Sequence, residues 1–144
     1  MRMNLNKKLY FKTVDSSDID VLFELLNKRK YSISHSKMPT YKSHKSFVES
    51  NPYMHWYLIL DKHPVGTFYI NSDNSIGMNF CNPTSNTVNE VLNFIKKNFE
   101  PQKAVSSKVP PYFYINVPES NLDIKGILDG LKLNPIQVSY KLSF

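Results

Sequence analysis

The segment SIGMNFCNPTSNTVNEVLNFIKK, residues 75–97, combines a strand, a short polar loop and an amphipathic helix. The run SIGMNF is apolar, and Val88, Val91, Leu92 and Ile95 then recur on one helical stripe. Unpaired backbone N–H groups at such a helix start attract anions, and phosphate-binding versions usually carry glycines that let the backbone wrap the ligand. This loop has no glycine. The segment therefore predicts either an altered phosphate site or a helix start that only caps itself.

The pattern around this segment predicts further strands and helices. Dense or alternating apolar runs predict strands over residues 8–14, 54–60, 65–70, 75–80, 112–117 and 136–144. Capping residues and helical spacing predict helices that start after residues 15–18, at Thr40 or Ser43, after residues 82–86 and at Ser120. Short polar turns between the middle strands indicate an antiparallel meander. We therefore expect one α/β (α+β) domain over residues 1–144, with a mixed, mostly antiparallel, twisted sheet of six to seven strands and about four helices packed on it.

The composition is that of a globular, basic chain. Hydrophobic residues make up 41% of the 144 residues, and no apolar run approaches the ~20 residues of a membrane span. The single cysteine, Cys81, excludes an internal disulfide framework and fits a reducing cytoplasm. The net charge is +6, but the lysines are scattered and only two arginines occur. We therefore expect no nucleic-acid or membrane partner, and the charge suits a small anionic ligand.

Three stretches resemble the GCN5-related N-acetyltransferase (GNAT) superfamily. Residues 57–80, YLILDKHPVGTFYINSDNSIGMNF, resemble its central meander. Residues 115–142, INVPESNLDIKGILDGLKLNPIQVSYKL, look like its closing strand, Asn-bearing turn, helix and final strand. Residues 32–49, SISHSKMPTYKSHKSFVE, are similar to the substrate-side region of members that acetylate amino sugars in surface-polysaccharide or flagellin-glycan pathways. The resemblance implies a GNAT-like fold over nearly the whole chain.

The same resemblance implies acetyl-CoA as co-substrate. Members hold the thioester between two splayed parallel strands, here 75–80 and 112–117, and the pantetheine arm pairs with free backbone groups of the first strand. A backbone N–H in that strand can also stabilise the oxyanion of the reaction. The cofactor-binding residues that the resemblance implies are Met78, Asn79, Phe80, Thr84, Ser85, Asn86 and Asn121.

Two departures from the family pattern affect these expectations. The family's pyrophosphate loop carries glycines and a Gln or Arg, whereas NPTSNTVNE has none of them. Asn82 or Asn86 could supply a positive φ in their place, or the polar residues only cap the helix. Many members also place a Tyr in the last helix to protonate the leaving thiolate, and this position matches Leu128. The two departures predict weakened or rearranged acetyl-CoA binding and a different source of the proton.

Candidate catalytic residues are few. His44, in the expected acceptor-side helix, is the first candidate base because the pKa of histidine lies near neutrality, and the alternative is an ordinary surface histidine. Glu119 follows the strand that would flank the thioester, and its alternative is a solvated turn carboxylate. His35 lies in the same acceptor-side region. The histidines and Cys81 show no metal-ligand spacing, so no metal site is expected.

These observations favour an acyl-CoA-dependent N-acetyltransferase that acts on a primary amine. The first guess for the small-molecule amine acceptor is a nucleotide-linked amino sugar, attacked directly at the thioester. The alternative is a degenerate GNAT-fold domain without transferase activity that serves as a binding or assembly module. A homodimer is compatible with either interpretation.

Overall fold

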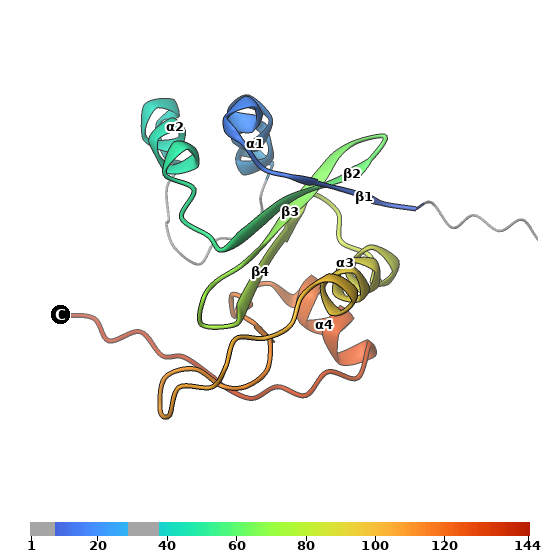
Figure 1. The fold of residues 1–144 in the computed structure, drawn as a ribbon, viewed down its shortest axis with the longest axis vertical. Coiled ribbons are helices and arrows are strands. Elements are labelled where there is room, and N and C mark those ends of the chain that lie inside the picture. The colour runs from blue at the N-terminus through green and yellow to red at the C-terminus, as the bar shows by residue number, and fades with distance from the viewer. Residues whose placement is uncertain (1–7, 29–37) are drawn as a thin grey trace, which may run out of the picture.

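The computed structural model describes residues 8–28 and 38–144 and has a five-stranded sheet at its centre (Figure 1). The strands lie in the order of the sequence: β1 (Tyr10–Thr13), β2 (His55–Asp61), β3 (His63–Ile70), β4 (Ser75–Phe80) and β5 (Tyr114–Ile115). Neighbouring strands are antiparallel except for β4 and β5, which are parallel. The expected mixed, mostly antiparallel sheet is therefore confirmed, with five strands rather than six to seven in the described residues.

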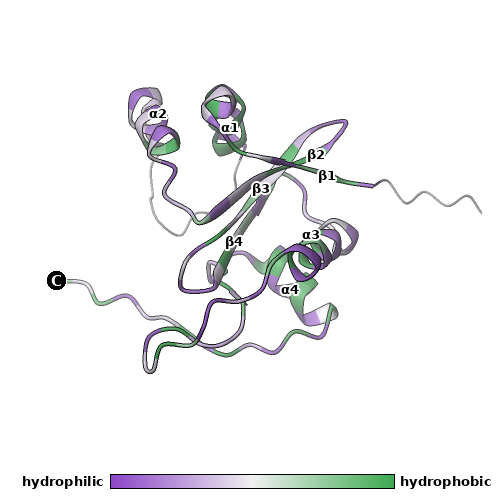
Figure 2. Ribbon diagram, viewed as in Figure 1, coloured by the Kyte–Doolittle hydropathy of each residue, from purple (hydrophilic) through white to green (hydrophobic). Residues whose placement is uncertain are grey.

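Helices cover both faces of the sheet. The helices α1 (Ile19–Asn27) and α2 (Tyr41–Ser50) lie on one face, and α3 (Ser85–Asn98) and α4 (Leu122–Gly130) lie on the other (Figure 1). Successive strand residues point to opposite faces, so each strand contributes to both hydrophobic clusters. Phe68 of β3 is fully buried with α3, whereas Trp56 of β2 packs with α1 and α2. Figure 2 shows this pattern, with apolar residues of α3 turned inward and mostly polar residues on α2.

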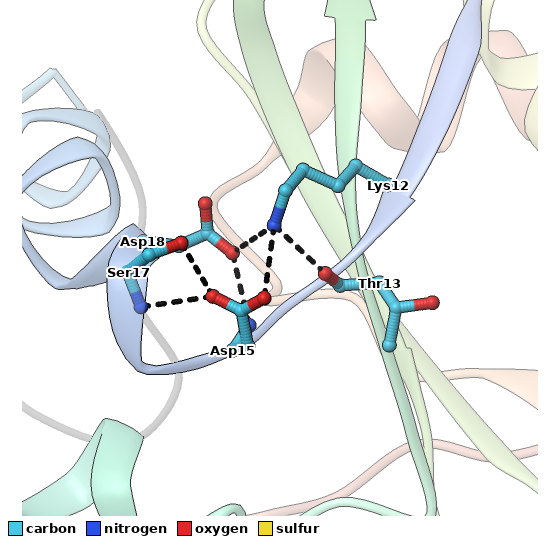
Figure 3. A network of polar contacts seen from close by, with 5 residues as sticks. All are labelled: Lys12, Thr13, Asp15, Ser17 and Asp18. Atoms are coloured by element: carbon cyan, nitrogen blue, oxygen red, sulfur yellow. Dashed lines mark hydrogen bonds and ion pairs between the residues drawn. The ribbon is translucent and has the colours of Figure 1, made fainter.

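A polar network fixes the connection from β1 to α1 (Figure 3). Asp15 caps the short 3-10 turn η1 (Ser16–Asp18), and the backbone N–H of Asp15 donates back to the Asp18 carboxylate at 2.9 Å. Lys12 donates to the same carboxylate at 2.7 Å, and this hydrogen bond raises the pKa of Lys12. The Ser17 hydroxyl donates to Asp15 and lowers the pKa of that carboxyl. The buried Asp18 therefore has an ionic partner, which holds the start of α1 against the sheet.

The C-terminal third differs from the prediction in three places. The strand expected over 112–117 is reduced to two residues. Asn121, not Ser120, caps α4, because the Asn121 Oδ1 accepts from the Ile124 N–H at 3.2 Å. The strand expected over 136–144 is absent: this segment is extended but forms no ladder with any described strand, and Val138 and Tyr140 are 74% and 91% exposed.

Candidate functional site

The parallel strands β4 and β5 separate almost as soon as they meet. They pair only at Ser75 with Tyr114 and at Ile76 with Ile115. The last bond between them runs from the Asn116 N–H to the Ile76 carbonyl at 3.2 Å. Beyond this point β4 continues to Phe80 while the chain after β5 turns into the loop before α4. The two strands therefore form the splayed pair that the resemblance implied.

The splay leaves backbone groups of β4 free. The Ser75 carbonyl accepts from Asn71 and the Cys81 N–H donates to Val65, so odd-numbered residues of β4 direct their backbone groups toward β3. Met78 and Phe80 must direct theirs toward β5, and within the described residues no group pairs with them. A free strand edge of this kind can pair with a ligand that carries amide groups, and a free N–H can stabilise an oxyanion.

A large cavity of about 1670 Å³ opens at the splay and continues onto the α1–α2 face of the sheet. Of the predicted site residues, those that line it are Met78, Asn79, Phe80, Asn121, His44 and Glu119. Aromatic residues from the α2 side also line it: Phe47, Tyr53, Trp56 and Tyr69. Thr84, Ser85 and Asn86 lie three to five residues beyond the lining residue Cys81 and are exposed. The structure thus brings the predicted strand residues, Asn121 and both candidate bases to one cavity and leaves the helix start outside its lining.

Asn74 holds the end of the cavity where β4 and β5 meet, and the sequence analysis had treated it only as a turn residue. Its side chain is fully buried and exchanges hydrogen bonds with the backbone of Gln102 at 2.6 and 3.1 Å and donates to the Pro110 carbonyl at 2.8 Å. Its own carbonyl accepts from the Tyr114 N–H at 3.2 Å. Asn74 therefore ties the β3–β4 turn to the loop that carries β5.

Asp73 adds a second connection between the same turn and β5. Its carboxylate accepts from the Ser75 hydroxyl at 2.6 Å and from the Tyr114 hydroxyl at 3.2 Å. The bond from Ser75 is the main reason that the pKa of Asp73 lies below its ordinary value. Burial raises the pKa of Tyr114, helped by the neighbouring Asp73 charge. An ionised Asp73 and a protonated Tyr114 together hold β5 beside β4.

Two threonine side chains cap the start of α3. The Thr84 Oγ1 accepts from the Thr87 N–H and the Thr87 Oγ1 accepts from the Thr84 N–H, both at 3.1 Å, which is a reciprocal capping box. No residue between 82 and 87 has a positive φ, so Asn82 and Asn86 do not replace the missing glycines in the way considered from the sequence. The free donors that remain for an anion are the first-turn N–H groups of Ser85 and Asn86.

We predict that Thr84→Ala lowers the free energy of unfolding by about 1 kcal/mol, because the cap of α3 is lost. Ser85→Ala is the matched control, since the exposed Ser85 hydroxyl has no partner among the described residues, and we expect a change below about 0.5 kcal/mol. Urea denaturation of both variants checks this. Equal unfolding free energies for the two variants would contradict the capping role of Thr84.

The two candidate bases differ in their surroundings. His44 is buried, and its Nε2 lies 3.0 Å from the Ile19 carbonyl oxygen. A carbonyl only accepts, so Nε2 carries the hydrogen and Nδ1 is the nitrogen left to accept a proton. Glu119 is exposed at the cavity, where its backbone carbonyl accepts from Lys125 at 3.3 Å. Both catalytic assignments stay predictions, and His35 lies outside the described residues.

Tyr69 is a further residue that lines the cavity. It stands opposite Gly77 in the β3–β4 register, and its ring extends over that glycine. A Cβ placed on Gly77 would lie 2.0 Å from the Tyr69 Cζ and 2.3 Å from its hydroxyl oxygen. The ring of Tyr53 stacks on that of Tyr69, with 3.8 Å between the two ring centroids. The Tyr69 hydroxyl therefore occupies the place of the missing side chain in β4.

Several solved structures are similar to this chain. An acetyltransferase from Thermus thermophilus matches with a TM-score of 0.64 and 11% identity, over 86% of this chain and 85% of that one. The aminoglycoside N-acetyltransferase AAC(6')-Ib11 matches with a TM-score of 0.58 and 11% identity, over 85% and 84%. The chain has the GNAT fold. A soil-metagenome aminoglycoside acetyltransferase, solved with sisomicin, is a third GNAT-fold neighbour (TM-score 0.52, 11% identity, covering 94% and 97%).

Neither the sequence comparisons nor the described residues indicate a metal site or a membrane span. No protein-family model matches the chain, and no curated protein matches its sequence. Within residues 8–28 and 38–144, no cluster of three or more His, Cys, Asp or Glu is arranged to hold a metal ion. No helix in this part of the chain is long and apolar enough to cross a membrane.

Proposed function

We propose that this protein is an acyl-CoA-dependent N-acetyltransferase that acetylates a primary amine of a small molecule. The observation that carries the proposal is the free edge of β4 at Met78 and Phe80, next to a cavity that extends to the α2 side. Acetyl-CoA is the co-substrate, and its pantetheine amides pair with this edge as an added strand would. Asn121, which lines the same cavity, keeps its Nδ2 as a donor because its Oδ1 caps α4.

The reaction requires orientation, deprotonation and stabilisation of an oxyanion. In our proposal the Met78 N–H donates to the thioester carbonyl oxygen and stabilises the negative charge that develops on it. The amine approaches from the α1–α2 side, and His44 through Nδ1 or Glu119 removes its proton. Binding both reactants in one cavity supplies much of the rate enhancement through proximity.

The charge around the acceptor side favours an amine that also carries an anionic group. Residues 25–48 contain no Asp or Glu. Within the described parts of this stretch, residues 25–28 and 38–48, the cations are Lys28, Lys42 and Lys45. A polycationic acceptor would meet like charge here, whereas a phosphate-bearing one would be attracted. Together with the aromatic lining, this supports a nucleotide-linked amino sugar as the first acceptor to test.

Isothermal titration of the folded protein tests the co-substrate. We expect acetyl-CoA to bind with a micromolar Kd and acetyl-pantetheine to bind within about tenfold of it, because the strand edge, not the glycine-free loop, supplies the contacts. Adenosine 3′,5′-bisphosphate alone should give no measurable heat. If acetyl-CoA itself gives no heat with a folded sample, the proposal fails and the chain is better described as a GNAT-fold binding or assembly module.

A further inference from the structure

The proposed reaction lacks an evident proton donor for the leaving group. When the carbon–sulfur bond breaks, the CoA thiolate must gain one proton. Leu128, which matches the family's tyrosine position, lines the cavity but has no proton to give. The proton must therefore come from a side chain on another element or from water.

We infer that Tyr69 is the catalytic residue that protonates the leaving thiolate, an inference that rests on the proposed function. Its phenol reaches β4 from β3 because Gly77 has no side chain. The hydroxyl is thereby placed where a Gly77 side chain would stand, and the next residue, Met78, directs its N–H toward β5. One short stretch of β4 thus holds the oxyanion donor beside a proton donor.

The surroundings keep the Tyr69 hydroxyl available. Tyr69 lines the cavity, and no described residue accepts a hydrogen bond from its hydroxyl. The stacked ring of Tyr53 fixes the plane of the Tyr69 ring at an interplanar angle of 12°. The orientation of the phenol is therefore set before a ligand enters.

Four other tyrosines line the cavity: Tyr53, whose ring stacks on Tyr69, and three whose hydroxyls are less suited to this role. The Tyr114 hydroxyl donates to Asp73 and is committed to holding β5. Tyr140 is 91% exposed on the C-terminal segment, and Tyr112 is 47% exposed before β5. Compared with these three, Tyr69 combines a half-buried ring, a fixed orientation and an available hydroxyl.

The step balances without any further reactant. The amine nitrogen forms a bond to the acetyl carbon, and the carbon–sulfur bond breaks with its electron pair on sulfur. The sulfur takes the phenolic proton of Tyr69, and the phenolate recovers through solvent the proton that His44 or Glu119 removed from the amine nitrogen. The products are the N-acetylated acceptor and CoA with a free thiol.

Tyr69→Phe tests the role because it keeps the ring and its stacking but removes the proton. We expect kcat with acetyl-CoA to fall about 100-fold while the Kd of acetyl-CoA stays unchanged. Tyr57→Phe is the matched control: it also loses one phenol, but its ring stacks on Phe68 on the opposite face of the sheet, so kcat should not change.

Two further measurements separate proton donation from a structural effect. An S-acetyl aryl thioester has a leaving group of lower pKa that needs less protonation, so Tyr69→Phe should slow its reaction much less. Leu128→Tyr, combined with Tyr69→Phe, should restore part of the lost kcat by placing a phenol at another position that lines the cavity.

The outcomes distinguish this role from the proposed function. If the wild-type protein turns over acetyl-CoA and Tyr69→Phe matches it, the role of Tyr69 is wrong and the function stands. An equal loss with both thioesters would also overturn proton donation. If the wild-type protein binds and turns over no acetyl-CoA, the proposed function fails and the role fails with it.

Discussion

Replacing Asn74 with Ala is expected to lower the free energy of unfolding by about 3–5 kcal/mol, the largest loss that we predict for a polar side chain of this protein. The fully buried amide makes three hydrogen bonds, to Gln102 twice and to Pro110 once. Ala would leave those backbone groups buried and unpaired, at about 1–3 kcal/mol each for a group that finds no water. Asn74 also has a φ of 72°, which costs Ala about a further 1–2 kcal/mol. Chemical denaturation measures the change.

Two variants separate these contributions. Asn74→Gly keeps the left-handed backbone without strain, so it should recover about 1 kcal/mol relative to Asn74→Ala. Asn89→Ala, on the exposed face of α3, is the control and should change the unfolding free energy by less than about 0.5 kcal/mol. A loss below about 1 kcal/mol in Asn74→Ala would show that the 101–111 loop does not depend on this side chain.

The same variant should also affect the candidate site. Asn74 binds the loop before β5, and its carbonyl pairs with Tyr114 at the only place where β4 and β5 meet. Loss of these contacts frees β5 to move relative to β4. We therefore expect Asn74→Ala to weaken acetyl-CoA binding at temperatures where the remaining fold is intact.

Local patterns were sufficient to predict the central meander. The runs at 54–60, 65–70 and 75–80 are dense in apolar residues and are joined by short polar turns, so period and turn chemistry agree there. The structure forms β2, β3 and β4 at these positions, with β4 at the predicted residues 75–80. The caps at Thr40 and Thr84 were predictable for the same reason, because a capping bond spans only three residues.

Strands that depend on distant partners were predicted less well. The segment 136–144 alternates apolar and polar residues as a strand does, but a strand also needs a neighbour with free backbone groups. No described strand pairs with this segment, and its apolar side chains stay exposed. β5 is short because its neighbour β4 diverges from it after Ile76. Sequence alternation contains no information on either fact.

In the candidate site, too, residues that depend on distant partners were harder to predict. The resemblance to the GNAT superfamily implied Met78, Asn79 and Phe80, and the structure adds that the register turns only the backbone groups of Met78 and Phe80 toward β5. Asn74 was missed because its partners are 28 and 36 residues away in the sequence. Tyr69 was not singled out because only the register places it opposite Gly77. Tyr69 and Gly77 are therefore best studied as a pair.

Gly77→Ala is expected to reduce kcat about 100-fold by displacing Tyr69. The new Cβ would lie 2.0–2.5 Å from three atoms of the Tyr69 side chain, which is closer than atoms approach without moving. The obstacle is the end of a side chain, so Tyr69 rotates away and loses its stack on Tyr53. We expect a stability cost of about 1–3 kcal/mol from the crowding. Steady-state kinetics and denaturation measure the two effects.

A double-mutant cycle shows whether the effect acts through Tyr69. In a Tyr69→Ala background the ring is absent, so adding Gly77→Ala should change neither kcat nor the unfolding free energy further. Gly66→Ala provides the contrast, because its Cβ would meet the Asn79 backbone oxygen at 2.3 Å, an obstacle that loss of Tyr69 cannot remove. Additive losses for Gly77→Ala and Tyr69→Ala would mean that the glycine serves the strand itself. Strong coupling would mean that Gly77 is required because a tyrosine must pass over β4 to reach the reacting thioester.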